Sequence, residues 1–167
     1  MKIKGLLISV LLLAGTALAG SNPKQVDAGA AFARLKALAG EWEADSPKGK
    51  VQNKYEVIAG GSVLLEHINV PGEGEMITAY HLDGDKLVLT HYCMAGNQPH
   101  MVAEKFDSPS GEVNFAFAGA SNLAPGAGHM HNASFHLVSD NRFDAKWDFF
   151  EAGKLKFSED MHFSRVK

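Results

Sequence analysis

The feature that most constrains the fold is a two-residue alternation of apolar and polar side chains that begins near residue 41 and runs to the end of the chain. Such alternation is typical of strands that bury one face. Short connections rich in Gly, Asp and Asn, such as Gly60-Gly61 and Asp83-Gly84-Asp85, separate the segments and are typical of hairpins. The pattern predicts strands at 41–46, 50–59, 62–70, 75–83, 86–94, 101–107, 112–118, 129–138, 142–151 and 154–165.

Ten short strands joined mainly by tight turns form an antiparallel meander, and a sheet of that length usually closes on itself because closure removes its exposed edges. Before the first strand, residues 28–39 are rich in Ala and Leu, with Phe32, Leu35 and Leu38 at helical spacing, and Gly40 follows. We therefore predict an all-β fold: a closed antiparallel up-and-down barrel of about ten strands with a short N-terminal helix, in a single domain over residues 28–167.

The N-terminus has the pattern of a secretory signal peptide. Lys2 and Lys4 precede the apolar run 5–15, and Ala17-Leu18-Ala19 supplies the small residues that signal peptidase accepts. A membrane span needs about 20 apolar residues, and this run is shorter. We expect a signal peptide at 1–19, a flexible leader at 20–27, and a secreted or periplasmic mature chain without a membrane span.

Charge and cysteine content exclude some kinds of partner. The chain has 16 Lys and Arg against 19 Asp and Glu, and loss of Lys2 and Lys4 with the signal peptide widens the acidic excess to five. An acidic domain has no electrostatic footprint for nucleic acid or for an anionic membrane surface. Cys93 is the single cysteine, so no intramolecular disulfide can form. In an oxidising compartment, we expect this thiol to be buried in the barrel.

Alternation also predicts which side chains line the lumen, namely Phe115, Phe117, Trp147 and Phe157. Glu159 falls on the apolar face of the last segment, where a buried carboxylate is costly unless it is paired or reaches water. Either the lumen is polar at this point or a bulge shifts the register of the strand.

Two residues at the ends of the predicted barrel carry a family resemblance. Gly40-Glu41-Trp42 opens the first strand, and Arg165 lies near the end of the last. This pairing is similar to the calycin superfamily of lipocalins and fatty-acid-binding proteins. The resemblance implies that Arg165 stacks on Trp42 and hydrogen-bonds nearby carbonyls, which closes one end of the barrel.

Three further stretches, 89–99, 128–131 and 147–154, resemble a family of exported bacterial proteins predicted to be lipocalin-like. That resemblance implies a barrel and secretion, and it brings no assigned activity. The haem-binding nitrobindins share the ten-stranded plan. Their longer Gly-x-Trp-x-Gly-x-Gly signature is not met, because Ala44 and Ser46 stand at the later glycine positions, so the sequence identifies no cofactor.

Several polar residues are candidates for chemistry in the lumen. His129 and His131 are two residues apart, so in a strand both leave the same face and could chelate a metal, or they could form a polar cluster at the barrel mouth. His91 and Cys93 share a face, and we expect His67 to neighbour them across the sheet.

Asn97 and Gln98, beside a rigid proline, have the position of ligand contacts at a barrel mouth, or of plain turn residues. The loop 119–128 is a candidate lid. The candidate ligand-binding residues are His67, His91, Cys93, Asn97, Gln98, His129, His131, Trp147 and Glu159.

Three functions fit these residues. The first is an exported barrel that binds an apolar or amphipathic small molecule. The second is a metal- or histidine-dependent enzyme that uses the same lumen. The third is a barrel with a filled interior that acts through its outer surface, which a cavity below about 300 Å3 would favour.

Overall fold

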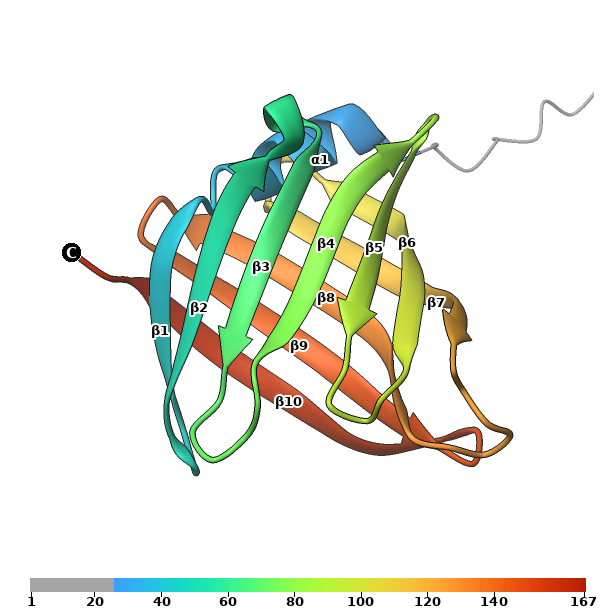
Figure 1. Cartoon of the computed structure of the whole chain (residues 1–167). Coiled ribbons are helices and arrows are strands. Elements are labelled where there is room, and N and C mark those ends of the chain that lie inside the picture. Colours follow the sequence, from blue (N-terminus) through green and yellow to red (C-terminus); the bar gives the residue numbers. More distant parts are fainter. Residues whose placement is uncertain (1–25) are drawn as a thin grey trace, which may run out of the picture.

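Each strand of the barrel pairs with the strand that follows it in the chain, because the connecting turns are short, and the last strand returns to pair with the first (Figure 1). The computed structural model describes residues 26–167. The predicted signal peptide lies outside the described residues, as does most of the leader. The elements are α1 (Ala28–Lys36), β1 (Gly40–Ser46), β2 (Gly49–Ile58), the 3-10 turn η1 (Ala59–Gly61), β3 (Val63–Asn69), β4 (Met76–Asp83), β5 (Lys86–Tyr92), β6 (Gln98–Asp107), β7 (Glu112–Ser121), β8 (His129–Ser139), β9 (Arg142–Glu151) and β10 (Lys154–Arg165).

The predicted fold class is confirmed: residues 26–167 form a closed antiparallel barrel of ten strands with one short helix. The largest boundary difference concerns β6 and β7, which pair as far as Gln98 with Ser121. The alternation there is obscured by small residues and by a register shift between His100 and Met101. Within residues 26–167, no helix is long and apolar enough to cross a membrane.

The barrel closes through a short contact between β1 and β10. Only Trp42 with Arg165 and Glu43 with Ser164 are paired, so the two strands diverge beyond this point. The guanidinium of Arg165 lies 4.2 Å from the centre of the Trp42 ring, and its Nη1 donates to the Ala39 carbonyl at 2.8 Å. This is the stacking that the resemblance implied.

Gly40 is required by the same closure. Its φ is +127°, and a Cβ at this position would lie 2.6 Å from Nη1 of Arg165. A side chain here would therefore be strained and would displace the arginine.

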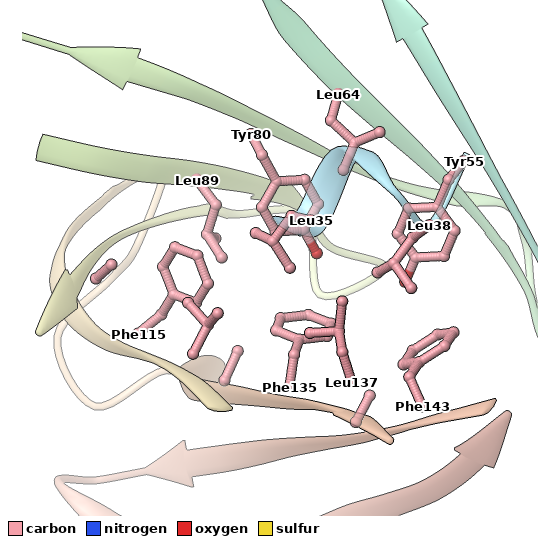
Figure 2. Packing of buried hydrophobic residues seen from close by; sticks show 14 of the residues in the cluster. Leu35, Leu38, Tyr55, Leu64, Tyr80, Leu89, Phe115, Phe135, Leu137 and Phe143 are labelled. Atoms are coloured by element: carbon pink, nitrogen blue, oxygen red, sulfur yellow. The ribbon is translucent and has the colours of Figure 1, made fainter. Parts of the chain in front are cut away.

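Hydrophobic packing fills the helix end of the barrel. Helix α1 crosses this end (Figure 1) and buries Phe32 and Leu35. Tyr80, Phe115 and Phe135 meet edge to face beneath it, with centroids about 6 Å apart (Figure 2). Phe115 is therefore part of a solid core rather than of an open lumen.

A polar lumen and a bulge were the two alternatives predicted for Glu159, and β10 has both features. A register shift lies between Leu155 and Phe157, yet Glu159 still pairs with Trp147 and shares its inward face. Phe157 stacks on Phe149 at 4.8 Å and is 43% exposed. The prediction that Phe157 lines the lumen is wrong, because the ring lies at the exposed start of β10.

Candidate functional site

A row of buried polar side chains crosses four consecutive strands of the barrel. Tyr55 on β2 is paired with Glu66 on β3, Glu66 with Thr78 on β4, and Thr78 with His91 on β5. Directly opposed residues of antiparallel strands lie on the same face, and all four are at most 2% exposed. We call these four residues the polar row.

Glu66 is the hydrogen-bonding centre of the polar row. One carboxylate oxygen accepts from the Tyr55 hydroxyl at 2.5 Å and from Asn53 Nδ2 at 2.7 Å, and the other accepts from the Tyr80 hydroxyl at 2.6 Å. Burial raises the pKa of Glu66, whereas these donors and the Thr78 hydroxyl lower it. These three donors take the place of water around the buried carboxylate.

His91 ends the polar row and faces empty space. Its Nδ1 lies 2.9 Å from the Thr78 hydroxyl, and its ring centre lies 5.0 Å from that of Trp147. Burial lowers the pKa of His91 to about 4, so the ring is neutral at neutral pH. Its Nε2 is buried and has no hydrogen-bond partner among residues 26–167, and the same holds for Oδ1 of Asn53.

Both unpaired atoms belong to residues that line one cavity of about 30 Å3 in the half of the barrel away from α1. This volume holds about two water molecules. Besides Asn53 and His91, Glu159 is a polar residue of its wall. The apolar part of the wall includes Val51, Ile68, Met76, Met130, Trp147 and Met161.

The cavity shares part of its wall with the surface. Val70, Glu159 and Met161 also line an outer depression of about 430 Å3, formed by the β1–β2 hairpin and β10. The depression lies where β1 and β10 no longer pair, so the short closure contact leaves this side of the barrel open. By the 300 Å3 criterion the cavity alone favours a barrel with a filled interior. The volume that a small molecule needs is found in the outer depression beside it.

Glu159 stands between the two spaces. Burial raises the pKa of its carboxyl, and the nearby Glu73 carboxylate raises it further, whereas Lys48 lowers it. Lys48 itself forms an ion pair with Glu73. The depression is also lined by Asp45 and Asp160, so carboxylates outnumber cations at the entrance.

Of the predicted site residues, the structure brings His91, Trp147 and Glu159 together at the cavity and places His67 elsewhere. His67 is on the outer side of β3, with Nδ1 2.7 Å from Glu75 and Nε2 3.4 Å from Glu56. The expected neighbour relation with His91 is wrong, because the inward residue of β3 is Glu66 and the residue opposite His91 is Thr78.

Cys93 follows the end of β5 and is half-buried. Its Sγ accepts a hydrogen bond from the Ala95 backbone at 3.5 Å, and burial raises the pKa of the thiol. A raised pKa makes a thiol a poorer nucleophile at neutral pH. The neighbour of His91 Nδ1 is the Thr78 hydroxyl and that of the thiol is the Ala95 backbone, so His91 does not act on Cys93 as a base.

Asn97 and Gln98 connect two loops at the end of the barrel opposite α1. Asn97 Nδ2 donates to the Gly128 carbonyl at 2.8 Å, and Gln98 Oε1 accepts from Asn122 at 2.9 Å. Both amides thus hold the candidate lid loop in place. Asn97 also has a buried Oδ1 without a partner, and neither residue lines the cavity.

His129 and His131 contact each other rather than the cavity. Nε2 of His129 is 3.0 Å from Nδ1 of His131, and the His131 ring stacks on Phe117 at 4.7 Å and on Phe150 at 4.2 Å. A register shift after Met130 gives that residue the inward position instead. Over residues 26–167, no group of three or more His, Cys, Asp or Glu side chains is arranged to hold a metal ion.

The sequence reasoning missed Asn53, Glu66 and Thr78. The sequence does contain a signal for Glu66. This residue is two positions from both Leu64 and Ile68, so it lies on the apolar face of its strand, and Glu159 likewise lies among the apolar residues of β10. A carboxylate on an apolar face requires buried donors nearby, and such donors are provided by neighbouring strands that one sequence does not align.

Comparison with known proteins supports the fold. No protein-family model and no curated protein matches the chain. Rv2717c from M. tuberculosis has a similar structure, with a TM-score of 0.54 and 15% identity, over 82% of this chain and 98% of that one.

A protein of unknown function from the DUF3598 family, from Nostoc punctiforme, has a TM-score of 0.51 and 11% identity. The match covers 79% of this chain and 49% of that one, so the chain spans about half the length of the Nostoc protein. These identities show a shared fold alone.

Proposed function

We propose that this protein is an exported, calycin-like binding protein that holds a small amphipathic molecule at the open side of its barrel. The observation that carries the proposal is the pair of unpaired polar atoms, His91 Nε2 and Asn53 Oδ1, which are buried and belong to the wall of one cavity. Buried polar atoms in folded proteins are almost always hydrogen-bonded, so a bound group or water at this point would complete them.

The shape of the site supports an amphipathic ligand. The cavity takes only a few atoms, beside Trp147 and the methionines Met76, Met130 and Met161. The outer depression is larger and opens to solvent. A polar group would therefore enter first and bind His91 and Asn53, while the rest of the molecule would lie against the apolar walls and in the depression.

A histidine-dependent enzyme in the same lumen is the second candidate. The polar row orients His91 from behind, as an acid–base histidine requires. Its pKa of about 4 nevertheless makes it a weak base at neutral pH, because efficient general bases have a pKa near the working pH. The geometry supports binding better than catalysis.

Export is proposed from the pattern of residues 1–19 alone. Expression of the full chain in a bacterial host, followed by N-terminal sequencing of the protein from periplasm and medium, tests it. A mature N-terminus at Gly20 is the expected result. An uncleaved chain retained in the cytoplasm would contradict the proposal.

Binding is tested by native mass spectrometry of the exported protein, together with metal analysis. We expect a retained organic mass that the Ala145→Leu variant loses, because Ala145 lines the cavity and a larger side chain fills it. Ala116→Leu, on the outer side of β7, is the matched control. An apo mass in repeated preparations, together with no response of the tryptophan fluorescence to cationic, neutral and anionic compounds, would overturn the proposal.

A further inference from the structure

We propose that the molecule held at this site carries a protonated primary amino group. The inference rests on the proposed binding function and specifies the chemistry of the ligand. It follows from the hydrogen-bonding state of the side chains that face the cavity, each of which offers an acceptor.

The orientation of the Asn53 amide is fixed by its buried partner. Its nitrogen donates to the Glu66 carboxylate at 2.7 Å, and a carboxylate accepts but does not donate when ionised. The amide oxygen must then be the unpaired atom. Asn53 therefore offers the cavity an acceptor.

One ring nitrogen of His91 is free for a ligand. Its Nδ1 lies 2.9 Å from the Thr78 hydroxyl, and its Nε2 is buried and has no partner among residues 26–167. A neutral imidazole bears one N–H, and the tautomer with the proton on Nδ1 donates to the Thr78 oxygen and has a free lone pair on Nε2. In this tautomer His91 offers a second acceptor beside Oδ1 of Asn53, and a ligand that itself only accepts hydrogen bonds would satisfy neither.

Glu159 supplies the third acceptor and a charge. It lines both the cavity and the depression, where Asp45 and Asp160 add negative charge and Lys48 is already paired with Glu73. An ammonium group has three donors and one positive charge. It matches two neutral acceptors and one carboxylate, and a buried cation needs such pairing.

The remaining walls define the rest of the ligand. The Trp147 ring attracts a cation through its face, and the methionine side chains adapt to apolar groups of varied shape. These features fit a short alkyl or arylalkyl primary amine, with its ammonium group at His91 and its apolar chain toward the depression.

The test compares hexylamine, hexanol and hexanoate, which share one chain length and differ in the polar group. Binding to the full mature protein is measured by isothermal titration calorimetry and by tryptophan fluorescence, with the Trp42→Phe variant to isolate the signal of Trp147, at neutral pH and low ionic strength. We expect hexylamine to bind at least about tenfold more tightly than either of the others. Equal or tighter binding of hexanol or hexanoate would overturn the inference.

Three variants link the result to the site. Glu159→Gln keeps the size of the side chain and removes its charge, so we expect about tenfold weaker hexylamine binding and unchanged hexanol binding. Glu41→Gln, exposed on β1, is the matched control and should change neither. Ala145→Leu should abolish binding of all three compounds, and hexylamine binding that survives it would place the amine elsewhere and overturn the inference.

Failure of this inference differs from failure of the proposed function. If hexylamine does not bind while another compound is retained in a manner that Ala145→Leu abolishes, the amine inference falls and the binding function stands. If no compound of any charge binds and the purified protein carries no organic mass, both fall, and water fills the cavity.

Discussion

The hydroxyl of Thr78 lies 2.9 Å from Nδ1 of His91, which is directly opposite it on the neighbouring strand. The side chain that faces the cavity is thus oriented by a residue of the polar row. Any change in Thr78 should reach the cavity through His91, without contact with a ligand.

Removal of the Thr78 hydroxyl should destabilise the protein. Thr78→Val keeps the shape of the side chain but leaves the buried Nδ1 of His91 unpaired, at an expected cost of about 1–3 kcal/mol. Urea denaturation measures this loss in the free energy of unfolding. The control is Thr90→Val, because Thr90 forms the same type of pair with His100 at 3.0 Å on the exposed face. Equal effects of the two substitutions would contradict the role of the polar row.

The depressed pKa of His91 predicts a stability change in acid. The folded value is about 4 against 6.5 in the unfolded chain, so between these values the unfolded chain binds more protons and stability falls as the pH falls. The full contribution is about 3 kcal/mol. This stabilisation is present when the pH is above the pKa of the unfolded chain, and it is lost as the pH falls to the pKa of the folded protein.

Two carboxyls oppose this dependence, and a variant isolates it. The raised pKa values of Glu66 and Glu159 mean that the native state keeps their protons longer, so they contribute stability that is lost as the pH rises. The wild type should lose the His91 contribution on acidification, whereas the His91→Gln variant has none to lose. The difference in the free energy of unfolding between the two proteins should therefore narrow by about 3 kcal/mol. His162→Gln, at an exposed site on β10, serves as control. A constant difference between wild type and His91→Gln would contradict the assignment.

The closure contact should depend on the guanidinium group and not only on its charge. Arg165 stacks on Trp42 and donates to the carbonyls of Ala37, Ala39 and Asp140. Lysine cannot make these planar contacts, so Arg165→Lys should cost about 1–3 kcal/mol, seen as a lower midpoint in thermal unfolding. The exposed Arg142→Lys, at the start of β9, should leave the midpoint within error. A similar shift in both would count against the contact.

The Cys93 thiol should react slowly in the native protein. It is half-buried, and burial raises its pKa, which reduces the thiolate fraction at neutral pH. We expect reaction with a chromogenic disulfide reagent to be at least about tenfold faster in urea than in buffer. Equal rates would mean that the thiol is accessible in the folded state.

Much of the fold could be predicted from sequence because hairpin turns and alternation are local. The ten strand segments, the inward face of Trp147 and the contact of Trp42 with Arg165 all follow from such patterns. The barrel can therefore be predicted from the two-residue alternation and the hairpin turns alone.

The candidate site was less predictable, because it depends on register between strands. The polar row exists only when β2, β3, β4 and β5 are aligned residue by residue. Register shifts in β8 and β10 likewise decide that Met130 faces inward and that Phe157 is exposed, and no local pattern marks a bulge. His67 shows the consequence, since a shift of one position separates an outward residue from an inward one.

The pairing of the first strand with the last also sets the order of events during synthesis. The wall of the barrel cannot be completed until Arg165, on the last strand, has left the ribosome and met Trp42. Until then an emerging chain exposes a growing sheet edge, which invites pairing with other chains. Closure is a contact between distant parts of the chain, which makes folding slow, so the protein stays open longest at the junction between β1 and β10, beside the outer depression.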